Sequence, residues 1–172
     1  IVDRHFNFFR EAKRYEALLL EKGPIDIPGY HELAVRFDRL ASHVNEDGAP
    51  VCLCHNDFFE LNFLVDEDDA YYLIDWEYAG MSDYANDFGT FCVCCQLSEK
   101  EVDKALVAYF DREPTLEERR HNLAHIALAG WCWYLWSLLK EAEGDFVGEW
   151  LYIYYNYAVL YIDKALALYG EE

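Results

Sequence analysis

The chain has 172 residues, which suffice for one domain with a large core, and 53% of them are hydrophobic. Its 33 acidic residues against 14 basic ones give a formal net charge of −19. That charge argues against nucleic acid and anionic membranes as partners and favours small cations. Charged residues interrupt every apolar run before the roughly 18 residues that a membrane-spanning helix needs.

Two helical patterns open the chain. Apolar residues recur at helical spacing over residues 3–23, where Gly23 and Pro24 end the pattern. A second helix is predicted over residues 29–44, before the turn-rich sequence NEDGAP. Short strands follow at 51–54, 63–65 and 70–74, separated by the polar loop 55–62 and the acidic turn 66–69.

The rest of the chain shows helical patterns without repeats or low-complexity tracts. These helices are predicted over residues 98–110, 115–143 and 148–170. The fold class we predict is therefore α+β, mostly α-helical, with a small β-hairpin near the middle of the chain.

Polar side chains stand at the ends of the predicted strands. Asp57 and Asn62 lie in the loop between the first two strands, and Asp75 follows the third. If the last two strands pair as a hairpin, Asp75 returns beside the loop. Phosphoryl transfer needs such a set, because one carboxylate orients the attacking hydroxyl while Asn and Asp oxygens bind Mg²⁺ on the nucleotide phosphates.

The sequence H-N-D-x-x-x-x-N at 55–62, followed by I-D-W-E at 74–77, resembles the catalytic and metal-binding motifs of the choline/ethanolamine kinase family. That family belongs to the aminoglycoside phosphotransferase and protein-kinase-like superfamily. The resemblance covers about residues 1–165, with its specific part between 55 and 89. It implies that residues 1–172 form the C-terminal lobe of a protein-kinase-like fold, with the hairpin carrying the catalytic and metal-binding loops.

The resemblance also implies roles for individual residues. Asp57 would be the catalytic carboxylate, and Asn62, Asp75 and Glu77 would hold Mg²⁺, with ATP as co-substrate. We expect His55 to support the loop by packing and hydrogen bonding rather than to take part in the chemistry.

The acceptor pocket is expected to be aromatic. Tyr78 and Asp87 lie where the choline kinase branch has acceptor-pocket residues, Trp133 and Trp136 match its W-x-x-W pair, and Tyr157 aligns loosely with its last aromatic residue. The physical argument is independent, because a quaternary ammonium has no N–H and must be recognised by aromatic faces and negative charge.

Other side chains are expected to be structural. Tyr154 and Tyr161 share a helical stripe with Tyr157 and are predicted to be core residues. His121 and His125 are four apart, but Asn122 stands where a zinc protease needs Glu, so they are predicted to be ordinary helix residues. The six cysteines lack the C-x2-C spacing of common zinc sites, and reduced, buried thiols of a cytoplasmic protein are predicted.

The sequence shows no Gly-rich phosphate-covering loop and no lysine in a β-like run, and its one methionine is Met81. We therefore expect a fragment of a longer kinase that lacks its N-terminal nucleotide-binding lobe and is inactive by itself.

The leading hypothesis is an ATP- and Mg²⁺-dependent kinase that converts choline to phosphocholine. Alternatives are a kinase acting on ethanolamine, another small amino alcohol or an aminoglycoside, and a non-catalytic, cation-binding pseudokinase lobe. The oligomeric state stays open.

Overall fold

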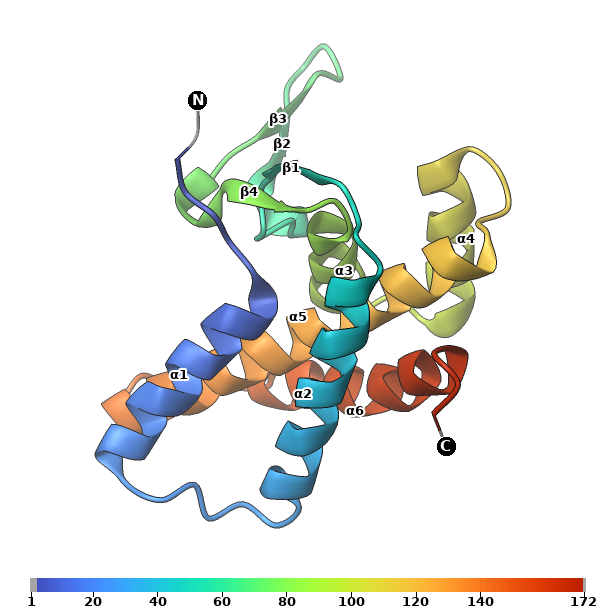
Figure 1. Ribbon diagram of the computed structural model, residues 1–172. Helices are drawn as coiled ribbons and strands as arrows, with labels where there is room; N and C mark the ends of the chain where they lie inside the picture. Colours follow the sequence, from blue (N-terminus) through green and yellow to red (C-terminus); the bar gives the residue numbers. More distant parts are fainter. Residues whose placement is uncertain (1–2, 172) are drawn as a thin grey trace.

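The computed structural model describes residues 3–171, which form six α-helices and two small antiparallel sheets (Figure 1). The helices are α1 (Phe8–Lys22), α2 (Tyr30–Glu46), α3 (Ala85–Cys94), α4 (Glu99–Phe110), α5 (Leu116–Glu143) and α6 (Trp150–Leu168). The strands are β1 (Val51–Cys54), β2 (Phe63–Val65), β3 (Tyr71–Leu73) and β4 (Gly80–Asp83). Short 3-10 turns, η1 (Glu60–Asn62) and η2 (Trp76–Tyr78), precede β2 and follow β3. The mostly α-helical α+β fold that the sequence predicts is confirmed.

Helix α5 is the centre of the molecule and packs against α1, α2, α3 and α6 (Figure 1). It begins with a capping box between Thr115 and Glu118 and ends at Gly144, whose φ of 93° lies in the left-handed region. Between those ends, apolar residues occupy all sides of the helix, as expected of a helix buried by neighbours all round.

Two glycines allow helices to approach α5 closely. A Cβ at Gly130 would lie 2.8 Å from the backbone nitrogen of Ala158 in α6. A Cβ at Gly89 in α3 would lie 2.5 Å from the carbonyl oxygen of His125. The packing of α3 and α6 on α5 therefore requires glycine, which has no side chain, at these two positions.

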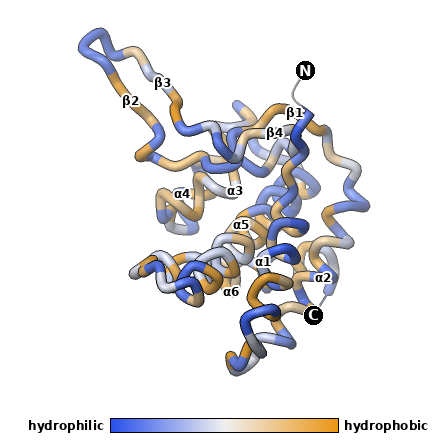
Figure 2. Tube along the Cα trace, turned by 90° about the vertical axis from the view of Figure 1, so that its left-hand side faces the viewer, coloured by the Kyte–Doolittle hydropathy of each residue, from blue (hydrophilic) through white to orange (hydrophobic). Residues whose placement is uncertain are grey.

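The two sheets lie above the helices and hold the polar loop between them. Strand β1 pairs with β4, with Cys54 opposite Gly80, and β2 pairs with β3 as the hairpin that the sequence predicts, with Phe63 opposite Leu73. Figure 2 shows the hairpin projecting from the body, with a hydrophilic turn and more hydrophobic strands.

Two elements were not predicted, β4 and α3. Strand β4 forms because β1 pairs with one of its edges and the N-terminal segment pairs with the other. On that second edge, the backbone N–H of Phe6 donates to the Met81 carbonyl, and the N–H of Met81 donates to the Arg4 carbonyl. Helix α3 forms by packing against α5. Within the described residues, no helix meets the length and apolarity that crossing a membrane requires.

Candidate active site

The loop between β1 and η1 carries Asp57 and Asn62, whose side chains contact each other directly. Asn62 Nδ2 donates to the backbone carbonyl of Asp57 at 2.9 Å and to its carboxylate Oδ2 at 3.1 Å. Asn62 is buried and is the last residue of η1, the 3-10 turn that follows Asp57 in the chain. The amide therefore fixes both the backbone and the carboxylate of Asp57.

The surroundings of Asp57 raise the pKa of its carboxyl group. Burial is the main cause, because it disfavours the ionised carboxylate, and the negative charges of Asp75 and Glu77 add to it. The hydrogen bond from Asn62 and the neighbouring His55 act in the opposite direction. The carboxylates of Asp75 and Glu77, which follow β3, therefore lie within electrostatic range of Asp57.

His55 joins the two loops. Its Nε2 lies 2.8 Å from the carbonyl oxygen of Ile74, the residue before Asp75, and its ring packs edge-on against Trp76. A carbonyl only accepts, so Nε2 carries the proton in this contact. The buried ring thus ties the loop of Asp57 to the strand end that presents Asp75.

Asp75 occupies an unusual backbone conformation. Its φ of 62° and ψ of 61° are left-handed, a region that Asp tolerates better than most residues. It stands at the start of η2, and its side chain is exposed together with that of Glu77. The left-handed turn directs the chain from the hairpin into η2, which ends at Tyr78.

The donor chemistry here fits Mg²⁺. The nitrogen of the Asn62 amide is used by Asp57, and its oxygen accepts no hydrogen bond from residues 3–171. The carboxylates of Asp75 and Glu77 are likewise not engaged within this range, and both are exposed. One amide oxygen and two carboxylates are the hard oxygen ligands that this cation takes.

Aromatic rings border the acidic loops. Trp133 on α5 meets Tyr78 edge-on at 5.2 Å between ring centroids and Trp136 at 6.1 Å. On α6, Trp150 stacks on Tyr154 at 5.5 Å and meets Phe59 of the loop at 5.3 Å. The site thus combines carboxylates with indole and phenol rings from α5, α6 and η2.

Comparison with known proteins decides the family. The model of the phosphotransferase enzyme family (APH) matches residues 3–121, which include the loop of Asp57 and the hairpin. This chain belongs to that family.

Relatives within the phosphotransferase family agree with this assignment. Protein LicA of Haemophilus influenzae is 29% identical over 177 residues, covering 96% of this chain and 61% of its own length. A choline/ethanolamine kinase family protein from Mesorhizobium loti has 27% identity and a TM-score of 0.75, over 95% of this chain and 55% of that one. Choline kinase LicA from Streptococcus pneumoniae has 25% identity and a TM-score of 0.79, over 94% and 57%. The chain therefore spans little more than half the length of these relatives.

The structure separates Tyr157 from the other predicted acceptor residues. Its hydroxyl donates to the Leu97 carbonyl at 2.7 Å, and its ring stacks on Tyr161. Tyr154 packs against the hydrophobic core, as predicted. Burial raises its pKa, and the neighbouring Cys94 and Asp57 raise it further. The aromatic stripe of α6 thus divides between two environments, with Trp150 stacked on Tyr154 and Tyr157 stacked on Tyr161, and the sequence spacing does not distinguish them.

Asp87 supports the loop of Asp57 from α3. Its Oδ2 accepts from the backbone N–H of His55 at 2.9 Å and its Oδ1 from that of Asn56 at 2.6 Å. Burial raises its pKa, although these two hydrogen bonds favour the carboxylate. We take the carboxylate as ionised, because both of its oxygens accept from backbone donors.

Sequence reasoning missed the buried amide network beside this loop. Asn56 has a φ of 66°, accepts from Asn86 Nδ2 at 2.9 Å and donates to the Tyr78 carbonyl at 3.0 Å. Thr90 adds a bond from its hydroxyl to the Asn56 carbonyl at 3.3 Å. The available signal was the repeated Asn-Asp pair at 56–57 and 86–87, an unusual choice for buried positions.

Proposed function

We propose that this chain is the acceptor-binding and catalytic lobe of an ATP- and Mg²⁺-dependent kinase that phosphorylates the hydroxyl of choline to phosphocholine. The observation that carries the proposal is the direct contact of Asn62 with Asp57, within electrostatic range of Asp75 and Glu77. Tyr78, which follows Glu77 in the chain, packs against Trp133 of α5. A phosphoryl-transfer site needs both parts, one for the nucleotide phosphates and one for the acceptor.

Asp57 is the residue proposed to act on the acceptor. Its carboxylate accepts a hydrogen bond from the choline hydroxyl and takes the proton as the oxygen bonds to the transferred phosphoryl group and ADP leaves. The raised pKa of Asp57 makes it a better proton acceptor than an exposed aspartate. Asn62 holds the carboxylate in place through its two hydrogen bonds.

Asn62, Asp75 and Glu77 would hold Mg²⁺ through their free oxygens. When bound together with ATP, the ion would neutralise negative charge on the nucleotide phosphates. Because the carboxylates come from a hairpin tied to the loop by His55, the metal-binding and hydroxyl-orienting groups keep a fixed relation.

The acceptor's ammonium group is proposed to bind against Tyr78, Trp133 and Trp136, with Tyr154 taking the place expected for Tyr157. Aromatic faces attract a quaternary ammonium through their quadrupole, and the nearby carboxylates add negative charge. Asp87 is proposed to position the loop rather than to contact the acceptor, because both its oxygens already accept from backbone N–H groups.

Ethanolamine is the nearest alternative acceptor. A primary ammonium needs hydrogen-bond acceptors, and the full engagement of Asp87 with the loop favours choline over it. An aminoglycoside is less favoured as the acceptor, since a polycationic sugar has no group that the paired indole rings of Trp133 and Trp136 would specifically recognise. A pseudokinase lobe is disfavoured because Asp57, Asn62 and Asp75 are all present and Asn62 contacts Asp57 directly.

We further propose that residues 1–172 act as a C-terminal lobe together with a nucleotide-binding lobe. Apolar side chains line the outer surface of the β2–β3 hairpin, where Leu64, Tyr72 and Trp76 are each about half exposed. Such a surface suits a covering partner lobe.

Turnover by the full-length protein tests the proposal. With ATP and Mg²⁺, we expect phosphorylation of choline in preference to ethanolamine and an aminoglycoside. Asp57→Asn should lower kcat by about 10²- to 10⁴-fold with the fold intact by circular dichroism. Wild-type-like turnover in Asp57→Asn would contradict the catalytic role, and preference for another acceptor would contradict the assignment to choline.

A matched pair of variants on α6 tests the acceptor pocket. Tyr154→Leu removes one aromatic face, so the KM for choline should rise about tenfold. Tyr157→Leu lies three residues away and should leave that KM unchanged while it lowers stability. The reverse pattern would return Tyr157 to the pocket and exclude Tyr154.

A further inference from the structure

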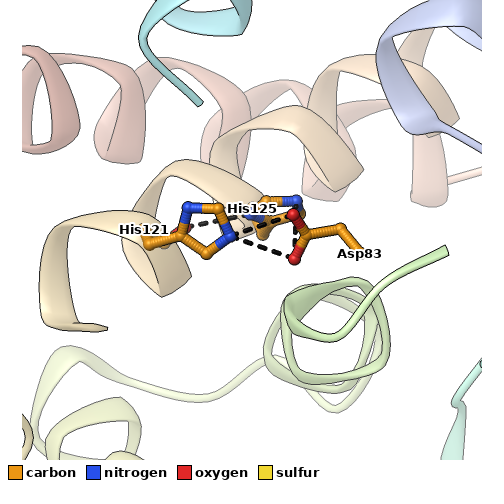
Figure 3. A group of neighbouring side chains, drawn as sticks. All are labelled: Asp83, His121 and His125. Carbon is orange, nitrogen blue, oxygen red and sulfur yellow. Dashed lines mark hydrogen bonds and ion pairs between the residues drawn. The ribbon is translucent and has the colours of Figure 1, made fainter. Parts of the chain in front are cut away.

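A second cluster of chemically active side chains lies where the end of β4 meets α5. His121 and His125 stand one turn apart on α5, and both rings point at the carboxylate of Asp83, the last residue of β4 (Figure 3). Each residue offers one ligand atom, and these atoms all lie within 4.8 Å of one another. The rings are buried, with 3% exposure each.

We propose that Asp83, His121 and His125 form a binding site for a divalent transition metal, with Zn²⁺ as the preferred ion. Two imidazoles and one carboxylate form a ligand set that zinc takes, with a fourth position left for water.

The spacing of the ligand atoms supports this assignment. His121 Nε2 lies 3.0 Å from each carboxylate oxygen of Asp83, and His125 Nε2 lies 3.6 Å from Oδ1. Zinc bonds to nitrogen and oxygen of about 2.1 Å at tetrahedral angles place ligand atoms about 3.3 Å apart. Small shifts of the Asp83 side chain would bring the three atoms to one ion.

The outer ring nitrogens are held as metal-binding histidines require. His121 Nδ1 lies 2.8 Å from Oδ2 of Asp47, and His125 Nδ1 lies 3.0 Å from the His121 carbonyl. The carbonyl acceptor places the proton of His125 on Nδ1, so that its Nε2 lone pair faces Asp83. His121 lies between two carboxylates and donates to both without metal, so zinc would displace its Nε2 proton while Asp47 continues to hold Nδ1.

Space and access are also present. A cavity of about 270 Å³ is lined by Asp83, His125 and Asn86, which leaves room for a bound water. The Asp83 side chain is 19% exposed, so an ion can reach the cluster from solvent.

Without a metal, the same residues form an ion network. Burial opposes the charged form of His121, but its bonds to Asp83 and Asp47 outweigh burial and raise its pKa. Burial lowers the pKa of His125 to about 4, which keeps that ring neutral.

The location gives the site a use. Zinc would join the end of β4 to α5, and through Asp47 it would also fix the end of α2. Asn86 and Asp87, which hold the catalytic loop, follow Asp83 by three and four residues. Metal occupancy would therefore stabilise the base of that loop.

Zinc binding by the chelator-treated, purified protein tests the proposal. We expect one Zn²⁺ per chain in competition with a chromophoric chelator, a rise in Tm on adding zinc, and visible absorption of a four-coordinate site with Co²⁺. His125→Ala should remove all three signals. Asp47→Asn should lower zinc affinity by about 10- to 100-fold, because it orients His121 without touching the metal.

Two control variants separate this site from other metal binding. His31→Ala removes an exposed histidine of α2, and Asp75→Asn removes a proposed Mg²⁺ ligand; both should keep the zinc signals. Asp75→Asn should at the same time lose turnover, so that failure of the zinc site and failure of the kinase proposal give different results. Absence of zinc binding in the wild-type protein, or equal binding in His125→Ala and Asp83→Asn, would overturn the inference.

Discussion

Asp87 holds the backbone of two consecutive residues directly before Asp57, and this gives a prediction at the scale of one side chain. In Asp87→Asn, one accepting oxygen becomes an NH2 group that faces a backbone N–H, so one hydrogen bond is replaced by two opposed donors. A displacement of the loop of about 1 Å would lower kcat about 100-fold. The KM for choline should change little, because the aromatic pocket stays in place.

The ratio of the two kinetic constants distinguishes positioning from binding. If Asp87 contacted the ammonium group directly, its neutralisation would raise KM more than it lowers kcat. Steady-state kinetics with choline as the varied substrate provide both constants. Asp26→Asn, in the exposed connection between α1 and α2, serves as the control and should leave both unchanged.

At this scale, the sequence predicts contacts between residues that are close along the chain, but not contacts between residues that are far apart along it. Asp57 and Asn62 share one loop and contact each other, and the β2–β3 pairing that precedes Asp75 also joins residues close along the chain. The contact between Asn56 and Asn86 joins residues 30 positions apart. Such contacts depend on how α3 packs against the loop, which no local pattern encodes.

Close packing of two helices leads to a prediction at the scale of elements. A methyl group at Gly89 would lie 2.5 Å from the carbonyl oxygen of His125 and 2.8 Å from its carbon. Backbone atoms of α5 cannot rotate away, so α3 must move outward. We expect Gly89→Ala to lower the free energy of unfolding by about 2 kcal/mol and to lower kcat, because α3 carries Asp87.

Urea unfolding together with choline turnover checks this prediction. In a helix without such contacts, Gly→Ala stabilises by about 0.5–1 kcal/mol, so even the sign of the change is informative. A more stable Gly89→Ala protein with normal kcat would show that α3 does not need its close approach to α5.

The elements that the sequence predicts are those with strong periodicity. The helices α1, α2, α4, α5 and α6 have long apolar patterns and clear end signals, and the structure confirms them within a few residues. Strand β4 reads GMSD and helix α3 contains Gly89 and Val93, so neither has a strong intrinsic preference. Both form because other elements pair or pack with them, and both lie next to the loop of Asp57.

Charge is the property that acts over the whole molecule. The formal net charge of −19 attracts cations toward a site that already holds three carboxylates. For a cationic acceptor, kcat/KM should therefore fall at least about threefold as monovalent salt rises from about 0.02 M to about 0.5 M, since salt screens exposed charges.

A neutral acceptor separates this attraction from other effects of salt. The alcohol 3,3-dimethylbutan-1-ol has the shape of choline but carries carbon in place of the charged nitrogen. Salt effects on ATP binding or on the fold act on both alcohols alike, whereas electrostatic attraction acts on choline alone.

We expect the ratio of the two kcat/KM values, choline over the neutral alcohol, to fall with salt toward a limit. That limit measures the contribution of the aromatic rings close to the ammonium group, which screening by salt affects least. A ratio independent of salt would show that the acidic surface has no part in acceptor capture and that the charge of −19 serves another purpose.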